Sequence, residues 1–271
     1  MGILPKLETR KGPNMTVYFI GAGPGDPELL TLKAAKKIGE CPVCLFAGSL
    51  VPEAVVACAP DDARVLDTAP MTLEETHAEI MTAHALGQDV ARVHSGDPSL
   101  YGAIAEQIRL LKRDGVDYQI IPGVPAYAAA AAAIGQELTV PEIAQSIVLT
   151  RMSMKSTSMP EHETLENFAR TRTTLAIHLA VRNVREIERV LIPYYGAECP
   201  VVVAYRASWP DQMIIRGTLS DIRKKIRDAK ITRTALIMVG PALDHSNDFV
   251  DSALYDPDVE HVLRNRKTPN P

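Results

Sequence analysis

Three loops rich in glycine and proline each follow a short apolar run that predicts a β-strand. They are residues 21–26 (GAGPGD), 95–98 (SGDP) and 122–125 (PGVP). Glycine permits a positive φ and a close approach of backbone to a ligand, and proline fixes the shape of a loop. Because ligands of open α/β sheets bind beyond the carboxyl ends of the strands, the loops predict a small-molecule site at one edge of a sheet.

Strands and helices alternate along the first half of the chain. Strands are expected at residues 17–20, 43–46, 90–94 and 118–121. Helices are expected after Asp26, over residues 72–86 and over residues 100–113. Asp26 can cap the first helix, and Thr72 with Glu75 forms a capping box for the second. This alternation predicts a parallel sheet with helices on its faces.

A second α/β unit is expected after a hinge at residues 135–141. Its strands are predicted at residues 146–149, 174–179, 201–205, 213–216 and 235–239, and its helices at 161–169, 184–191 and 219–229. The fold class is therefore α/β, with two α/β domains over residues 15–134 and 142–243. Residues 1–14 are expected to be a disordered extension, and the polar residues 244–271 a loose C-terminal tail.

The charge and apolarity of the chain argue against two classes of partner. A net charge of −4 disfavours a nucleic-acid-binding protein, which usually carries a basic surplus. The longest apolar run, residues 126–134, is shorter than the roughly 20 residues that a bilayer requires. Residues 1–14 lack the apolar segment of a signal peptide. We therefore expect a cytoplasmic protein that binds neither nucleic acid nor membrane.

The four cysteines are Cys41, Cys44, Cys58 and Cys199. They are too few and too scattered for a disulfide framework in a chain of this length. Cys41 and Cys44 have the spacing of a redox or metal pair, but no second pair completes a zinc site. A structural role is expected for them, and no bound metal.

The sequence does not match either of two common nucleotide-binding motifs. The first loop reads G-x-G-x-G, so its third glycine comes one residue too early for the dinucleotide motif G-x-G-x-x-G, and no acidic residue ends the second strand. A P-loop is excluded because no G-K-[ST] follows. The loops therefore predict a small-molecule site without naming its ligand.

Longer motifs around these loops carry a specific resemblance. Residues 21–35 (GAGPGDPELLTLKAA) closely resemble the opening motif of the tetrapyrrole (corrin/porphyrin) methylases, and SGDPSLYG with IIPGVPAY resembles their second motif. Within that family, FAGSLV (46–51), residues 150–161 and YRASWP (205–210) are similar to precorrin-4 C11-methyltransferases. Pro125, where many relatives have Thr, and Leu179, where uroporphyrinogen methylases have Met, argue against the uroporphyrinogen branch.

The resemblance implies a cofactor and its contacts. In this family S-adenosylmethionine binds in the cleft between two α/β domains, leaves as S-adenosylhomocysteine, and the proteins are usually homodimers. Carried over by position, the cofactor-binding residues are Pro24, Ser95, Gly96, Asp97, Tyr101, Pro125, Ala126, Leu179, Ala207, Ala235 and Leu236.

Methyl transfer from a sulfonium requires little acid–base catalysis. A sulfonium methyl group is already activated, so its transfer depends mostly on proximity, alignment and exclusion of water. Asp97 and Tyr101 are the catalytic candidates. His94 is the last residue of a predicted strand, and we expect it to have a structural role.

A corrin precursor carries many carboxylates, so its site needs basic groups. Arg151, Lys155, Arg182 and Arg206 follow predicted strands of the second domain and are the candidate substrate-binding residues. The expected reaction is methylation of precorrin-4 at C11 to give precorrin-5. Two alternatives stay open: methylation of cobalt-precorrin-4 or another tetrapyrrole ring, and a non-catalytic module that binds an adenosine metabolite.

Overall fold

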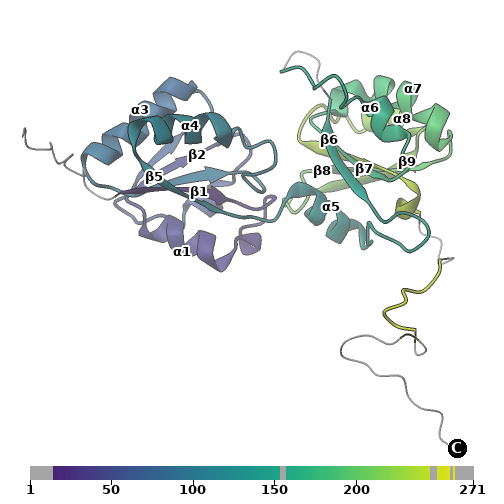
Figure 1. Cartoon of the computed structure of the whole chain (residues 1–271), viewed down its shortest axis with the longest axis horizontal. Coiled ribbons are helices and arrows are strands. Elements are labelled where there is room, and N and C mark those ends of the chain that lie inside the picture. Colours follow the sequence, from purple (N-terminus) through teal and green to yellow (C-terminus); the bar gives the residue numbers. More distant parts are fainter. Residues whose placement is uncertain (1–14, 153–156, 245–248, 257–258, 260–271) are drawn as a thin grey trace, which may run out of the picture. The chain divides into compact units, whose positions relative to one another are not determined.

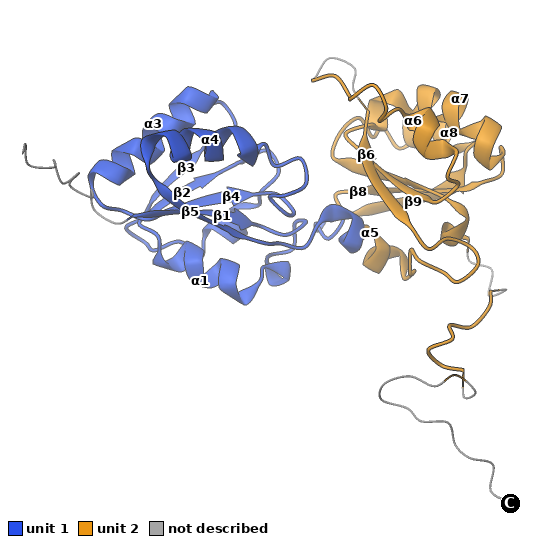
Figure 2. Cartoon of the chain, in the orientation of Figure 1, with its two compact units in different colours: residues 1–129, 207–211 blue, residues 130–206, 212–271 orange. Residues whose placement is uncertain are grey.

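The computed structural model describes residues 15–152, 157–244, 249–256 and 259, and the chain divides into two compact units. Unit 1 contains the residues up to Ala129 together with residues 207–211 (Figure 2). Unit 2 contains residues 130–206 and the residues from Gln212 onward. Helix α5 (Ala126–Ile134) contains the first boundary between them.

Unit 1 is built on a parallel five-stranded sheet in the order β3-β2-β4-β1-β5. The strands are β1 (Thr16–Gly21), β2 (Val43–Phe46), β3 (Arg64–Asp67), β4 (Val90–His94) and β5 (Asp117–Ile121). The predicted parallel sheet is thus confirmed. Because β4, β1 and β5 are neighbours that point the same way, the loops that follow them emerge at one edge.

Helices cover both faces of this sheet (Figure 1). They are α1 (Leu32–Glu40), α2 (Glu53–Val56), α3 (Leu73–Ala85) and α4 (Ile104–Asp114), with a short 3-10 turn η1 (Pro27–Leu29) before α1. Side chains of β1 alternate between the faces, as the two-residue period of a strand requires. Phe19 packs in the core shared with α3 and α4, and Ile20 in the core shared with α1 and α2.

The helix starts in unit 1 agree with the sequence predictions except at two places. The capping box of Thr72 and Glu75 is present at α3. Asp26 accepts a hydrogen bond from the Glu28 N–H, but it caps only the 3-10 turn, and α1 begins after a second cap at Thr31. Helix α4 begins at Ile104 and not near residue 100.

Unit 2 is built on a mixed sheet in the order β6-β7-β10-β8-β9. The strands are β6 (Ile147–Arg151), β7 (Thr174–His178), β8 (Pro200–Tyr205), β9 (Met213–Thr218) and β10 (Ala235–Val239). Strands β6 and β7 are parallel, and β10 runs antiparallel to both β7 and β8. Strands β6, β7 and β8 therefore end at the same edge, where β9 and β10 begin.

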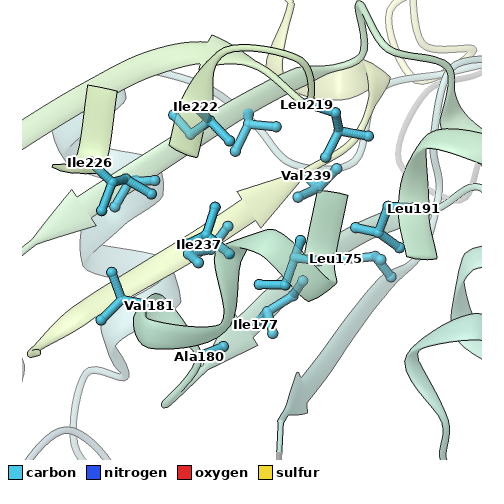
Figure 3. Close-up of a cluster of buried hydrophobic side chains, with 14 of the residues drawn as sticks. Leu175, Ile177, Ala180, Val181, Leu191, Leu219, Ile222, Ile226, Ile237 and Val239 are labelled. Carbon is cyan, nitrogen blue, oxygen red and sulfur yellow. The ribbon is translucent and has the colours of Figure 1, made fainter. Parts of the chain in front are cut away.

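One apolar core joins this sheet to its helices (Figure 3). The helices are α6 (Leu165–Ala169), α7 (Val184–Tyr195) and α8 (Ile222–Asp228), with 3-10 turns η2 (Val181–Asn183) and η3 (Pro241–Leu243). Leu175, Ile177, Ile237 and Val239 on the strands pack with Leu191 of α7. Of the helices that the structure describes, none has both the length and the apolarity of a membrane span.

The cysteines are free thiols. Cys41 ends α1 and Cys44 lies within β2, both buried in the core of unit 1. Burial raises the pKa of each thiol to about 12. Neither thiol is therefore an accessible thiolate at neutral pH.

Candidate functional site

The first and second loops of unit 1 (residues 21–26 and 95–98) are joined through their backbones. The Ala22 N–H donates to the His94 carbonyl oxygen at 2.7 Å, which extends the pairing of β1 with β4 past the end of the strands. Gly23 and Gly96 then exchange two hydrogen bonds, of 2.7 and 3.2 Å. The predicted meeting of these two loops at one edge of the sheet is confirmed.

The third loop (residues 122–125) touches both of the others at glycine positions. A Cβ on Gly21 would lie 2.5 Å from the Gly123 nitrogen, and a Cβ on Gly123 would collide with the Gly96 carbonyl oxygen. Any larger residue at Gly21 or Gly123 would push the loops apart. These glycines therefore allow backbone to pack on backbone, and the three loops form one surface.

Asp97 ties the second loop to the third. One of its carboxylate oxygens accepts the Gly123 N–H at 2.9 Å, and the other accepts the Ser99 N–H at 2.8 Å and the Ser99 hydroxyl. A carboxylate has about four lone-pair positions, so at most about one stays open for a ligand. Partial burial raises the pKa of Asp97, but these hydrogen bonds outweigh it and hold the pKa below its ordinary value. Asp97 is thus a weak base.

The segment that leads from the second loop into α4 is strained. Tyr101 and Ala103 have φ values of 57° and 50°, in the left-handed region that non-glycine residues rarely adopt. A Cβ on Gly102 between them would collide with the Pro98 carbonyl oxygen. Helix α4 begins only after this segment, at Ile104, and Tyr101 is 44% exposed. Backbone strain of this kind concentrates at functional sites.

His94 fits a structural role. It is buried, and its ring centroid lies 5.9 Å from that of Phe19. Burial, together with the positive charge of Arg92, lowers the pKa of His94 to about 3. The imidazole is therefore neutral and a poor proton acceptor near neutral pH.

The remaining predicted cofactor residues lie in three places. Ser95, Pro125 and Ala126 belong to the loop surface of unit 1, where Pro24 is buried. Ala207 also belongs to unit 1 and is buried. Leu179, Ala235 and Leu236 lie in unit 2: Leu179 follows β7 with a φ of 54° and 70% exposure, and the other two open β10.

Basic residues gather at the edge of the unit 2 sheet where β6, β7 and β8 end. Arg151 ends β6, Arg206 follows β8, and Arg182 follows β7. Lys230 and Arg233 precede β10 and line a cavity of about 170 Å³ with Tyr205, Met213, Ala229, Ile231 and Thr232. We call Arg151, Arg182, Arg206, Lys230 and Arg233 the basic edge.

Backbone contacts hold part of this edge in place. The Arg182 side chain donates through Nε to the Thr232 carbonyl oxygen at 2.9 Å, and the Arg206 N–H donates to the Thr234 carbonyl oxygen at 3.0 Å. Arg182 therefore shapes the loop that carries Lys230 and Arg233. Lys155, the fourth predicted substrate residue, lies outside the described residues.

Sequence reasoning missed two sets of residues. Lys230 and Arg233 come before a strand, and only the antiparallel course of β10 brings them to the edge where other strands end. Ser208 and Trp209 contact the first loop from far along the chain. The motif at residues 205–210 stood out in the sequence, but nothing in it indicates this contact.

Comparisons with known proteins agree with the arrangement of loops and sheets. Residues 16–223 match the model of the tetrapyrrole (corrin/porphyrin) methylases. A precorrin-4 C(11)-methyltransferase of Sinorhizobium sp is 52% identical over 93% of this chain and 99% of its own. The structure of a cobalt-precorrin-4 methyltransferase of cobalamin biosynthesis superposes with a TM-score of 0.83 at 42% identity, over 90% of this chain and all of that one.

A uroporphyrin-III C-methyltransferase of Thermus thermophilus, solved with S-adenosylhomocysteine, superposes with a TM-score of 0.70 at 29% identity. That likeness covers 84% of this chain and 93% of the other. The family model, the curated relative and both solved structures each cover most of the chain, and the protein belongs to the tetrapyrrole (corrin/porphyrin) methylase family.

Proposed function

We propose that this protein is an S-adenosylmethionine-dependent methyltransferase of cobalamin biosynthesis that methylates C11 of precorrin-4 and yields precorrin-5 and S-adenosylhomocysteine. The observation that carries this proposal is the 52% sequence identity to the precorrin-4 C(11)-methyltransferase of Sinorhizobium sp, over 99% of the length of that protein. The three joined loops of unit 1 are the surface on which we expect the cofactor to bind.

The residues of unit 1 fit S-adenosylmethionine. Gly96 has a φ of 65°, and a Cβ at this position would make only ordinary van der Waals contacts, so the space beside its backbone holds one further atom without collision. Pro125 and Ala126 border this space, at 3.8 and 3.9 Å. Asp97 retains an acceptor position for a hydroxyl or ammonium group. We expect these residues, with Pro24, Ser95 and Tyr101, to bind the cofactor, and Leu179, Ala207, Ala235 and Leu236 to contact its adenine.

When bound, S-adenosylmethionine supplies a methyl group that its sulfonium already activates. The chain has to align that methyl group with the substrate carbon and exclude water. The C–S bond breaks as the new C–C bond forms, and the substrate later loses a proton. The low pKa values of Asp97 and His94 make both poor acceptors for that proton. Tyr101, the other catalytic candidate, is exposed beside the second loop, where its neutral hydroxyl can form a hydrogen bond but is also a poor base.

The basic edge fits a substrate that carries several carboxylates. Guanidinium groups pair with carboxylates through two parallel hydrogen bonds, and an ammonium adds a compact charge. We propose that Arg151, Arg206, Lys230 and Arg233 bind acetate and propionate side chains of the corrin precursor, while Arg182 holds their loop. We also expect a homodimer, acting in the cytoplasm without nucleic acid or membrane partners.

A second candidate is the cobalt-containing substrate, because the solved cobalt-precorrin-4 methyltransferase is 42% identical to this chain. Anaerobic assays with precorrin-4 and cobalt-precorrin-4, under matched conditions, separate the two. The proposal requires the metal-free substrate to have the higher kcat/KM. A preference for the cobalt form would instead assign the chain to that reaction.

Isothermal titration with S-adenosylhomocysteine tests cofactor binding separately from the choice of substrate. We expect saturable binding near one ligand per chain, in protein freed of copurified ligand. Binding without turnover of S-adenosylmethionine on either tetrapyrrole would favour the non-catalytic adenosine-binding module. The absence of any binding by folded protein would contradict the proposal.

A further inference from the structure

Residues 207–211 form a docking segment that belongs to unit 1, although the chain on either side belongs to unit 2. The segment connects the end of β8 at Tyr205 to the start of β9 at Met213. It contains Trp209, the single tryptophan of the chain. Its position in unit 1 follows from contacts with the first loop.

Two hydrogen bonds attach the docking segment to the first loop. The Trp209 indole N–H donates to the Pro24 carbonyl oxygen at 2.9 Å. The Ser208 hydroxyl oxygen accepts the Asp26 N–H at 3.0 Å. The two bonds fix the backbone on both sides of Gly25, and they join residues more than 180 positions apart in the sequence.

The indole also packs against Gly25. A Cβ on Gly25 would overlap Cδ1 and Nε1 of the Trp209 ring. Glycine at this position is thus explained by its backbone φ of 157° and by the tryptophan of the same chain, and neither reason involves a ligand. The Pro24 carbonyl and the Asp26 N–H are both bonded within the chain and are therefore engaged before any ligand binds.

The backbone of the docking segment is itself strained. Ser208 in the segment has a φ of 70°, and Arg206 directly before the segment has a φ of 45°. Left-handed conformations at non-glycine residues persist only where surrounding contacts hold them. The bonds to the first loop are contacts of this kind. The segment and the loop therefore hold each other in one arrangement.

We propose that Trp209 and Ser208 are positioning residues for the cofactor: they fix the shape of the first loop before S-adenosylmethionine binds. This inference rests on the proposed function. A loop that is already ordered loses less conformational entropy on binding, so its ligand binds more tightly. Loss of either contact should weaken cofactor affinity, although neither side chain needs to touch the cofactor.

The first test compares W209F and S208A with the wild type by titration with S-adenosylhomocysteine. W209F keeps an aromatic ring over Gly25 but removes the N–H donor, and we expect it to weaken affinity by about tenfold, with a similar or smaller loss for S208A. The matched control is Y195F, which removes a hydroxyl that donates to the Thr173 carbonyl oxygen at 2.7 Å in unit 2. Y195F should lower Tm and leave affinity unchanged.

Kinetics and fluorescence distinguish a role in positioning the first loop from an effect on protein stability alone. In W209F and S208A the KM for S-adenosylmethionine should rise while the KM for the tetrapyrrole and kcat change little. Because Trp209 is the single tryptophan, its emission reports the docking segment directly. S208A should red-shift this emission, and S-adenosylhomocysteine should reverse the shift.

A double-mutant cycle of G25A and W209A tests the coupling. G25A alone should displace the indole and weaken binding, and its effect should be clearly smaller in the W209A background. Equal effects in both backgrounds would overturn the inference, as would W209F and S208A binding S-adenosylhomocysteine as tightly as wild type. A wild type that does not bind this ligand would instead overturn the proposed function.

Discussion

The Asp97 carboxylate accepts the backbone N–H of Gly123 at 2.9 Å and so joins the second and third loops of unit 1. Asp97 lies in the loop after β4, and it thereby controls the position of a loop that follows a different strand, β5. Its side chain is engaged inside the protein before any cofactor arrives. Asp97 therefore combines a structural role with its predicted role in cofactor binding.

Asp97→Ala should weaken binding of S-adenosylhomocysteine by about tenfold or more, since it removes an acceptor and releases the third loop. Titration of the variant measures this loss. Asp89→Ala is the control, because Asp89 accepts the Thr16 N–H at 2.7 Å at the opposite end of β1. Both variants should lose stability, and only Asp97→Ala should lose affinity. Equal affinities in the two variants would remove Asp97 from the site.

Gly123→Ala should disrupt the joined loops, because its Cβ would collide with the Gly96 carbonyl oxygen. Overpacking of this kind costs about 1–3 kcal/mol, and cofactor affinity should fall with it. Gly115→Ala is the control: its φ of 70° imposes strain of about 1 kcal/mol, but nothing lies within 4 Å of its Cβ. Denaturant unfolding and ligand titration of both variants test the contrast. Normal binding by Gly123→Ala would contradict the described packing.

His94 should make the protein less stable in acid. Its pKa is lowered to about 3 by burial, whereas an unfolded histidine titrates near 6.5. Below pH 6.5 the unfolded state binds a proton that the folded state does not, so stability falls as the pH drops from about 6.5 toward 3. The loss is up to about 1.4 kcal/mol per pH unit. NMR titration of the imidazole measures the folded pKa directly, and a value near 6.5 would refute this explanation.

Arg233→Ala should raise the KM for the tetrapyrrole about three- to fivefold, the modest effect of an exposed ion pair, and leave cofactor affinity unchanged. Lys230→Ala should act in the same direction. Arg189→Ala provides the control, since Arg189 pairs with Glu186 on α7 and lies outside the basic edge. An equal change of KM in Arg189→Ala would indicate a general charge effect and not a carboxylate-binding edge.

The sequence predicted those parts of the fold that local patterns determine. Strand β4 and strand β10 have the bounds expected from their apolar runs, and Thr72 begins α3 with the capping box that its spacing indicates. The parallel direction of the strands in unit 1 was predicted from the alternation of strands and helices. Loops placed after parallel strands then had to emerge at one edge.

Other features depend on contacts that no local pattern shows. Strand β3 was missed because most of its side chains are exposed and lack an apolar run. The left-handed residues Tyr101 and Ala103 shorten α4, and neither residue type signals that conformation. The bond from Trp209 to Pro24 joins residues 185 positions apart. Such contacts depend on how the assembled sheets bring distant segments together.

The proposed reaction is transfer of a methyl group to C11 of precorrin-4. The most direct measurement incubates the protein anaerobically with precorrin-4 and S-adenosylmethionine carrying a 13C-labelled methyl group, and locates the label by NMR. We predict one labelled methyl carbon per product, bonded to C11, with one S-adenosylhomocysteine formed for each. A label on another ring carbon, or no transfer by protein that binds S-adenosylhomocysteine, would contradict the proposed function.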